Sequence, residues 1–345
     1  MVELRPLNVS LSAARILIIG PSWVGDMVMA QSLFISLKQT HPDCLIDVLA
    51  PAWSAALLAR MPQINQAIAL PLSHGQLALS TRIKLGRQLS QQHYRQAIVL
   101  PNSWKSALPV FFADIPLRTG YIGELRWGLL NDARRLHKQR LPMTVQRFVA
   151  LGLPANAAPA PAYPLPKLLV SPALQADVRA KFKVSAGSKI LAICPGAEYG
   201  PAKRWPAAHF AEVARQKHQA GWQVWLFGSV KDQAVAAEIQ TLSGGIGRDF
   251  TGNTSLGEAV DLLSLASVVL SNDSGLMHVA AALDKQVIAI YGSSDPGFTP
   301  PLHPQAKILS LNLPCAPCFK RDCPLGHTRC LTDISPAIVL AAIQP

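Results

Sequence analysis

The chain has 345 residues, which is enough for two domains of ordinary size. Half of the residues are hydrophobic and only 15% are charged, so a largely disordered protein is excluded. The formal net charge of +12 is typical of proteins that meet nucleic acid, anionic lipid headgroups or phosphorylated substrates. A basic surface kept only for solubility is the alternative. The sequence has neither an apolar stretch of about 18 residues nor a signal-peptide pattern, which predicts a cytoplasmic protein without a transmembrane helix.

Short apolar runs alternate with helical patterns along the chain, and each run ends near Gly, Pro or a polar residue. Such runs are typical of buried parallel strands, and their alternation with helices predicts doubly wound sheets. The expected strands are Ile16–Gly20, Leu45–Leu49, Ala97–Leu100, Ile190–Cys194, Gln223–Phe227, Val268–Leu270 and Val287–Tyr291. The clearest helical patterns are Ala207–Ala220 and Leu256–Ala266.

A proline-rich segment at residues 153–167 separates the two series of strands. Proline removes backbone donors and fixes φ, so this segment is expected to be a stiff linker. The predicted order is an N-terminal extension (1–14), an α/β domain (15–152), the linker (153–167) and a second α/β domain (168–345). We expect two doubly wound Rossmann-like domains that face each other across a cleft, with ligands beyond the carboxyl ends of the strands.

The first expected strand leads into Gly20-Pro21-Ser22-Trp23-Val24-Gly25-Asp26, and a helix is expected from Met27. A carboxylate at Asp26 is favoured by the helix dipole, so a simple capping role is one interpretation and a functional role the other. The glycines do not follow G-x-G-x-x-G, which argues against a dinucleotide site. No G-K-[ST] follows them, so a P-loop is excluded.

Two loops of the second half suit phosphate. Residues 194–206 form a glycine-bearing loop with Lys203 and Arg204, which could hold a diphosphate together with backbone amides. In residues 271–278, small side chains let phosphate oxygens approach the first free amides of a helix expected at Val279–Leu283. A capping Asp273 and a packed His278 are the alternative interpretation of this second loop.

Positive residues also gather in the first half, close to the ends of expected strands. Such a group could recognise the anionic groups of an acceptor, and a solvated basic face is the alternative. The cations are Lys105, Arg118 and Arg126, and the uncharged Asn102 lies in the same group.

Four of the six cysteines lie within sixteen residues, at Cys315, Cys318, Cys323 and Cys330. Four thiolates so close in sequence suit a tetrahedral structural zinc, whereas an iron–sulfur cluster lacks its usual spacing. Because the surrounding loop holds little apolar material, a metal would give it fixed points. Free thiols or a redox pair are the alternatives, and a reducing compartment argues against a disulfide framework.

Four longer stretches resemble glycosyltransferase family nine and, within it, the heptosyltransferase II branch: GPSWVGDMVMAQSL (20–33), LPNSWKSALPVFFADIPLRTGY (100–121), PGAEYGPAKRWP (195–206) and SNDSGLMHVAAAL (271–283). The resemblance implies an α/β GT-B fold that needs no catalytic metal or other cofactor. It implies transfer of L-glycero-D-manno-heptose from ADP-heptose to the first heptose of the lipopolysaccharide inner core, with inversion. A family-nine enzyme of the heptosyltransferase I type is the alternative.

The resemblance also implies roles for individual residues. Asp26 matches the general base of the family, Lys203 the lysine on the donor diphosphate, and Asp232 an acid on the adenosine ribose. The donor-binding loop corresponds to Asp273, Ser274, Gly275 and His278. Neither the cysteine cluster nor the extension before Arg15 belongs to the family pattern, so a zinc ion there would be structural.

The implied partners are an ADP-heptose donor and an anionic heptosyl-Kdo-lipid A acceptor, not nucleic acid. The enzyme is then expected to be peripheral to the cytoplasmic face of the inner membrane, where its positive charge would meet anionic groups. Two rival classes are a nucleotide-sugar-modifying enzyme, such as an epimerase or dehydrogenase, and a basic module that binds lipid or nucleic acid. The lack of G-x-G-x-x-G and of Tyr-x-x-x-Lys argues against the former.

Overall fold

The computed structural model describes residues 14–72, 76–155, 157, 161–185 and 187–343. The predicted N-terminal extension therefore lies outside the described residues, apart from Ala14. The chain divides into two compact units, residues 1–22 with 30–164, and residues 23–29 with 165–345. The division near residue 164 falls within the predicted linker, whose described residues form neither helix nor strand. Unlike the predicted boundaries, the division assigns the short stretch 23–29 to the second unit.

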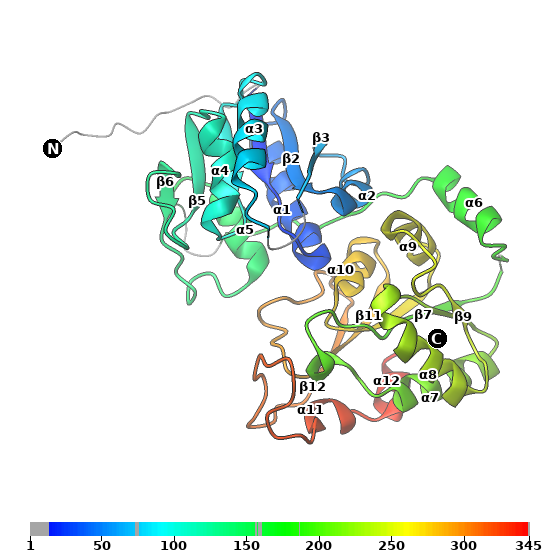
Figure 1. The fold of residues 1–345 in the computed structure, drawn as a ribbon. Coiled ribbons are helices and arrows are strands. Elements are labelled where there is room, and N and C mark those ends of the chain that lie inside the picture. Colours follow the sequence, from blue (N-terminus) through cyan, green and yellow to red (C-terminus); the bar gives the residue numbers. More distant parts are fainter. Residues whose placement is uncertain (1–13, 73–75, 156, 158–160, 186, 344–345) are drawn as a thin grey trace. The chain divides into compact units, whose positions relative to one another are not determined.

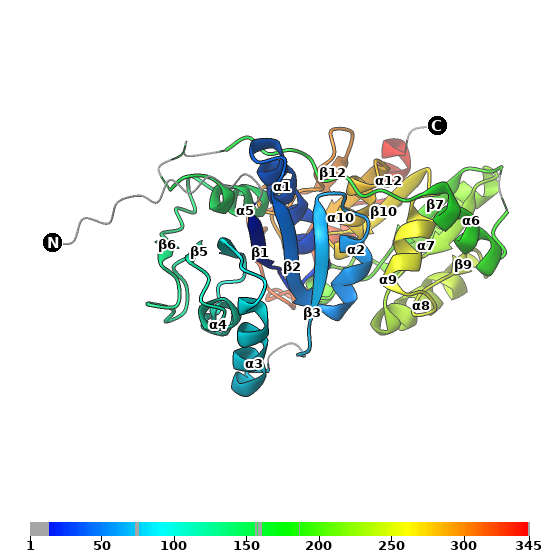
Figure 2. The same ribbon diagram turned by 90° about the horizontal axis from the view of Figure 1, so that it is seen from above.

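The first unit is built on a six-stranded sheet in the order β3-β2-β1-β4-β5-β6. Every neighbouring pair is parallel, and Figure 2 shows β1, β2 and β3 side by side. This order places β1 between β2 and β4, so the chain changes direction across the sheet at the β1/β4 junction. The strands are β1 (Arg15–Ile19), β2 (Leu45–Pro51), β3 (Ile64–Leu70), β4 (Gln96–Val99), β5 (Leu117–Tyr121) and β6 (Asp132–Arg134).

The second unit repeats the same topology with its own six parallel strands, in the order β12-β11-β10-β7-β8-β9. Read from β9, this is again the order 3-2-1-4-5-6, with its change of direction between β7 and β10. The strands are β7 (Ile190–Cys194), β8 (Gln223–Leu226), β9 (Arg248–Asp249), β10 (Val268–Asn272), β11 (Gln286–Tyr291) and β12 (Lys307–Ser310). The predicted pair of doubly wound sheets is confirmed.

Helices connect the strands in both units (Figure 1). The first unit holds α1 (Val24–Thr40, whose first residues belong to the second unit), α2 (Ala55–Leu58), α3 (Leu79–Ser90), α4 (Trp104–Phe112) and α5 (Thr144–Gly152). The second holds α6 (Pro172–Lys181), α7 (Ala207–Gln219), α8 (Gln233–Ser243), α9 (Leu256–Leu263), α10 (Gly275–Ala282), α11 (Arg329–Thr332) and α12 (Pro336–Ala342). Short 3₁₀ turns lie at Ala52–Ser54, Pro201–Lys203 and Val230–Asp232.

Two predicted helix starts differ from the structure. Helix α1 begins at Val24 rather than Met27, because Gly25 continues the helix instead of forming a turn before it. Helix α10 begins at Gly275 rather than Val279, directly after its N-cap residue Ser274. Both helices therefore begin closer to the preceding strand than the sequence pattern indicated. No helix among the described residues has the length and apolar character needed to cross a bilayer.

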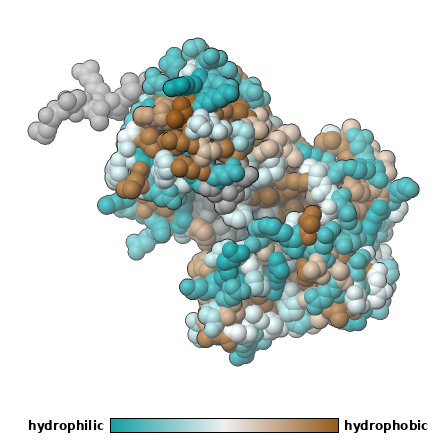
Figure 3. All heavy atoms as spheres, in the orientation of Figure 1, coloured by the Kyte–Doolittle hydropathy of each residue, from teal (hydrophilic) through white to brown (hydrophobic). Residues whose placement is uncertain are grey.

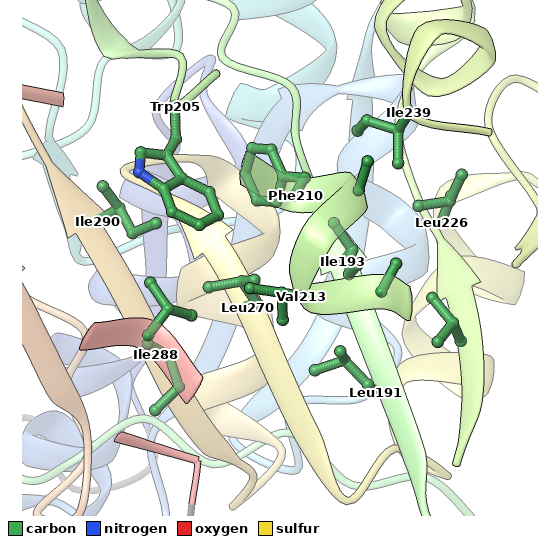
Figure 4. Packing of buried hydrophobic residues seen from close by; sticks show 14 of the residues in the cluster. Leu191, Ile193, Trp205, Phe210, Val213, Leu226, Ile239, Leu270, Ile288 and Ile290 are labelled. Carbon is green, nitrogen blue, oxygen red and sulfur yellow. The ribbon is translucent and has the colours of Figure 1, made fainter. Parts of the chain in front are cut away.

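Trp205 links the loop after β7 to the core of the second unit. Its indole is fully buried and meets the ring of Phe210 edge-on, with centroids 4.8 Å apart (Figure 4). The indole Nε1 donates to the carbonyl of Ile334 at 2.9 Å, and the backbone N–H donates to Asn272 Oδ1 at 3.0 Å. The loop is thus anchored to α7, to β10 and to the C-terminal segment by a single residue.

We predict that Trp205→Ala lowers the free energy of unfolding by about 3–5 kcal/mol, because it leaves a large cavity. Urea denaturation followed by circular dichroism measures the effect. The matched control is Trp127→Ala in the first unit, where the indole is 70% exposed and the expected change is within about 0.5 kcal/mol. Equal effects of the two substitutions would contradict the anchoring role of Trp205.

Candidate active site

Except for Asp232, which follows β8, the predicted donor-binding residues lie after the carboxyl ends of β7 and β10, on either side of the change of direction in the second sheet. In doubly wound sheets this is the usual place for a ligand. The two loops are joined through Asn272, whose Nδ2 donates to the carbonyl of Pro195 at 2.7 Å. Its Oδ1 accepts the Trp205 N–H, so one buried side chain holds both loops.

Lys203 and Asp273 form an ion pair across these loops. Lys203 Nζ lies 2.5 Å from Asp273 Oδ2, and their side chains are only 19% and 6% exposed. The ammonium also lies 5.3 Å from the ring centroid of Tyr199. The Asp273 N–H donates to the carbonyl of Ile290 at 3.1 Å, which ties the acid to the neighbouring strand β11. The sequence predicted both residues for the donor site, and the structure brings them into direct contact.

Asp26 lies in the first turn of α1, within the stretch 23–29 that belongs to the second unit. The pKa of Asp26 is raised to about 6, chiefly by burial and also by the negative charge of Asp273, whereas Lys203 lowers it. The side chain remains partly exposed. A carboxyl group with this pKa is mostly ionised at pH 7 and is a stronger base than an ordinary aspartate.

The backbone of α1 fits closely against α10. A Cβ added to Gly25 would lie 2.5 Å from Cδ2 of His278, and one added to Gly275 would lie 2.7 Å from Cβ of Val24. Both glycines are therefore needed for the close approach of the two helix starts. The His278 ring is buried, and burial lowers its pKa to about 4, so it is neutral at pH 7. The structure shows His278 as a packing partner of Gly25, and its predicted contact with the donor stays a prediction.

Ser274 is the N-cap residue of α10, but its hydroxyl does not cap the helix. The Ser274 Oγ lies 3.0 Å from the Oγ of Ser271 instead. The first amides of a helix have no acceptor within the helix itself, and the helix dipole favours an anion beside them. This geometry agrees with the predicted phosphate contact at Ser274 and Gly275 without testing it.

Asp232 ends the 3₁₀ turn after β8 and forms a separate group from the Lys203–Asp273 pair. Its Oδ2 accepts hydrogen bonds from the N–H and Oγ of Ser229 at 2.9 and 2.8 Å, and its Oδ1 lies 4.0 Å from Arg204 Nη2. A Cβ on Gly196 or on Gly228 would come within 2.7 Å of the Asp232 side chain. Asp232 thus fixes the turn after β8, and its contact with a ribose stays a prediction.

The sequence analysis missed a set of buried hydroxyls at the same edge of the second sheet. Ser293 and Ser294 follow β11 and Thr251 follows β9, and all three are at most 5% exposed. Their hydroxyls have no hydrogen-bond partner among the described residues, as is also true of Arg204 Nε. Buried polar groups are rarely left without partners, so these atoms are candidates for contact with a polar ligand. Isolated serines and threonines carry no sequence signal that could have identified them.

Two of the predicted acceptor-binding residues of the first unit, Arg118 and Arg126, make hydrogen bonds within the protein. Arg126 is buried and donates to the carbonyls of Tyr121 and Pro101 and to Asn102 Oδ1, and burial lowers its pKa to about 10. Arg118 donates to the carbonyls of Leu129 and Ile115 at 2.8 and 2.6 Å. These donors hold the loop between β5 and β6, and an acceptor contact by either cation stays a prediction.

The other two predicted acceptor residues, Asn102 and Lys105, lie after β4, next to the change of direction in the first sheet. Asn102 is exposed apart from its contact with Arg126, and Lys105 lies in the first turn of α4. Their position fits the usual ligand edge of such a sheet. An acceptor contact by either residue stays a prediction.

A structural zinc at Cys315, Cys318, Cys323 and Cys330 stays a prediction. Among the described residues, no group of three or more His, Cys, Asp or Glu side chains is placed to hold a metal ion. All four cysteines of the cluster are free thiols of intermediate exposure. The Cys323 thiol accepts hydrogen bonds from a turn of backbone N–H groups, foremost that of Thr328, which lower its pKa. Burial raises the pKa of Cys330, with the other three thiols adding to the effect.

The cysteine-bearing segment is held by contacts with the rest of the second unit. Leu331 is fully buried in the core of the second unit, and Cys330 packs against the same core. The Phe319 N–H donates to the carbonyl of Ser293 at 2.7 Å, while the Phe319 carbonyl accepts the Tyr199 hydroxyl at 2.8 Å. The Ala202 N–H donates to the Arg321 carbonyl at 3.0 Å. The segment therefore braces the loop that carries Lys203.

Comparison with known proteins gives consistent results. The sequence model of "Glycosyltransferase family 9 (heptosyltransferase)" matches residues 82–329. Lipopolysaccharide heptosyltransferase 2 of Salmonella typhimurium is 47% identical over 96% of this chain and 97% of its own length. The Escherichia coli K12 protein of the same name is 46% identical with the same coverage. Lipooligosaccharide heptosyltransferase 2 of Haemophilus influenzae is 47% identical over 96% of this chain and 98% of its own.

Solved structures agree with the sequence comparison. The structure of E. coli ADP-heptose LPS heptosyltransferase II has a TM-score of 0.85 and 43% identity, covering 95% of this chain and 97% of that one. A family 9 glycosyltransferase from Veillonella parvula shares the fold with a TM-score of 0.82 at 20% identity, covering 97% of both chains. With two parallel six-stranded sheets of this kind, the fold is GT-B, as predicted. The chain belongs to glycosyltransferase family 9, the heptosyltransferases.

Proposed function

We propose that this protein transfers L-glycero-D-manno-heptose from ADP-heptose to the first heptose of the lipopolysaccharide inner core, with inversion at the anomeric carbon. Three relatives that are 46–47% identical to this chain over 96% of its length are heptosyltransferases 2. This similarity favours the heptosyltransferase II branch over the heptosyltransferase I branch. The observation that carries the proposal is the grouping of Asp26, Lys203 and Asp273 around two closely packed helix starts.

In the proposed reaction, a hydroxyl oxygen of the acceptor heptose attacks the anomeric carbon of the donor. The bond between that carbon and the diphosphate oxygen breaks, and ADP leaves with the electron pair. Asp26 accepts the proton of the attacking hydroxyl, which a carboxylate with a pKa near 6 can do at neutral pH. The positive charge of Lys203 and the free amides at the start of α10 stabilise the negative charge that develops on ADP.

The second unit is the proposed donor-binding domain, since the anion-suited groups gather there. Lys203 holds the diphosphate while Asp273 positions its ammonium, and Asp232 is the proposed ribose contact. Ser274, Gly275 and His278 line the same loop. The buried hydroxyls of Ser293 and Thr251 supply further partners for a polar donor.

The first unit is the proposed acceptor-binding domain, with Asn102 and Lys105 beside its ligand edge. Its substrate is an anionic, lipid-anchored heptosyl-Kdo acceptor. For such a substrate the enzyme works as a peripheral protein at the cytoplasmic face of the inner membrane, where the net charge of +12 favours anionic lipid.

The proposed activity requires no cofactor, because Lys203 and the start of α10 supply the positive charge that the leaving diphosphate needs. In a coupled assay we expect ADP release only when ADP-heptose and a heptosyl-Kdo-lipid A acceptor are both present.

The rate of heptose transfer in EDTA is expected to stay within about twofold of the rate without it, because no step needs a metal ion. Loss of the rate in EDTA that Mg²⁺ restores would contradict the proposal that no metal takes part. Turnover of ADP-heptose with no acceptor requirement would contradict the proposed transfer.

Asp26→Asn is expected to lower kcat by about 100-fold or more, as is typical when a general base is lost. The affinity for ADP should change little, because Asp26 does not contact the diphosphate in the proposed geometry. In the unmodified enzyme, kcat/KM should fall as the pH drops below about 6, where Asp26 becomes protonated. Near-normal turnover of Asp26→Asn would leave Asp26 as a helix-terminal residue without a chemical role.

Two charge variants give this pH profile an internal control. Asp273→Asn removes the negative charge that raises the pKa of Asp26, so the acidic fall in kcat/KM should move to lower pH. Lys203→Ala removes the positive charge that lowers this pKa, so the fall should move to higher pH. Shifts in the same direction for both variants would mean that another group controls the profile.

Lys203→Ala should weaken the binding of ADP and ADP-heptose alike by about 1.5–3 kcal/mol, the usual effect of losing a charged hydrogen bond. Isothermal titration calorimetry measures both affinities. The matched control is Lys181→Ala on α6, whose exposed ammonium pairs with Glu258 and should leave ADP affinity unchanged. Gly275→Val is a poor test of the same site, because its side chain would collide with Val24. Equal ADP affinities in the two lysine variants would place the diphosphate elsewhere.

A further inference from the structure

The loop between β5 and β6 carries the two most exposed large hydrophobic side chains among the described residues. Leu125 is 85% exposed and Trp127 is 70% exposed, and Ile122 at the start of the loop is also exposed. Arg126, which lies between them in sequence, is buried. Residues 122–127, called the docking loop below, therefore invert the usual arrangement in which apolar side chains point inward and cations outward.

The docking loop is held in this inverted form by strong contacts. The Arg126 guanidinium donates to the Pro101 carbonyl at 2.7 Å and, through Nε, to the Tyr121 carbonyl at 2.9 Å. The Trp104 N–H donates to Glu124 Oε2 at 3.3 Å. Because a buried guanidinium needs all these acceptors, the loop cannot easily turn Trp127 inward. The two apolar side chains are thus presented outward by a fixed backbone.

A second set of exposed side chains lies beside the docking loop and is strongly basic. The Ile122 N–H donates to the Arg134 carbonyl at 2.7 Å, so the loop starts next to the segment that follows β6. Residues 135–140, called the basic segment below, include exposed Arg135, Lys138 and Arg140. None of these three cations forms an ion pair within the described part of the chain. Their charge is therefore available to an anionic partner.

Both segments lie at the carboxyl edge of the first sheet. Arg126 binds the backbone of Pro101 and the side chain of Asn102, the residues that follow β4 at the proposed acceptor edge. Hydrophobic side chains also gather over the neighbouring helix α4 (Figure 3). This edge combines apolar and cationic groups in one place.

We propose that the docking loop and the basic segment form the surface by which this enzyme binds an anionic lipid bilayer. Trp127 and Leu125 enter the boundary between headgroups and acyl chains, where tryptophan is enriched in membrane proteins. Arg135, Lys138 and Arg140 attract the anionic headgroups around them. Two apolar side chains with unpaired cations on a neighbouring segment are too small for a stable protein interface but suit a reversible membrane contact.

This inference rests on the proposed function, because a lipid-anchored acceptor explains why the acceptor edge would face a membrane. Docking by this surface brings the acceptor sugars to the loops after β4 and β5 while the lipid stays in the bilayer. The second unit needs no membrane contact of its own for this arrangement.

The direct test is flotation of the full chain with vesicles of phosphatidylcholine alone or with about 30% phosphatidylglycerol. We expect binding only to the anionic vesicles, weakening as salt is raised because exposed charges are screened. The double variant Leu125→Ser/Trp127→Ala should bind about tenfold less. Arg135→Gln/Lys138→Gln/Arg140→Gln should bind at least tenfold less and lose most of the salt dependence. The matched control, Leu242→Ser on an exposed position of α8, should bind normally.

A second measurement separates this inference from the proposed function. With a water-soluble, deacylated acceptor and no lipid, both variants should keep the wild-type rate of heptose transfer, whereas with acceptor in vesicles their rates should fall. Vesicle binding unchanged in both variants would overturn the docking surface. Equal losses on soluble and vesicle-bound acceptor would overturn it too, since the loop would then act in the acceptor site. If the wild type binds anionic vesicles through these residues but transfers no heptose, the surface stands and the proposed function fails.

Discussion

The ion pair between Lys203 and Asp273 is the interaction on which the candidate site depends. It joins the loops after β7 and β10, the two strands between which the second sheet changes direction. A nearly buried ion pair contributes little net stability, because desolvating both charges offsets their attraction. Its value here is geometric, since it fixes an ammonium group beside the start of α10 before any ligand arrives. Preorganised charge of this kind needs no rearrangement when negative charge develops.

The same pair also sets the properties of Asp26. Burial is the largest cause of the raised pKa of Asp26. The excess negative charge of two acids beside one lysine, when all three are ionised, adds to it. The pKa of Asp26 rises as a consequence. His278 cannot relieve this excess, because its own burial keeps it neutral at pH 7. Gly25 packs against His278 and Gly275 packs against Val24, which keeps the starts of α1 and α10 close together. The absence of a side chain at both glycines therefore helps to set the surroundings of Asp26.

The sequence was sufficient for the central part of the fold and for part of the site. Strands such as Ile190–Cys194 are buried along their whole length, so their apolar runs are unmistakable, whereas β3 and β12 at the sheet edges are largely exposed and were missed. Loop motifs pointed to Lys203 and Asp273, which the structure brings into contact, because phosphate-suited residues have recognisable local patterns. Contacts between residues that are far apart in the sequence leave no such local pattern. Nothing local to Arg126 indicated that it is buried, and nothing local to the cysteines indicated that Leu331 and Phe319 hold their segment in place.

The two units show how one topology can use its cations in different ways. In both sheets the order of strands creates the same ligand edge, and basic residues follow the strands at that edge. In the second unit, Lys203 points its charge at a site and is held by an acid. In the first unit, Arg118 and Arg126 donate to backbone carbonyls and so help to fix the shape of a loop. A positive residue near the end of a strand therefore predicts function only once its hydrogen-bond partners are known.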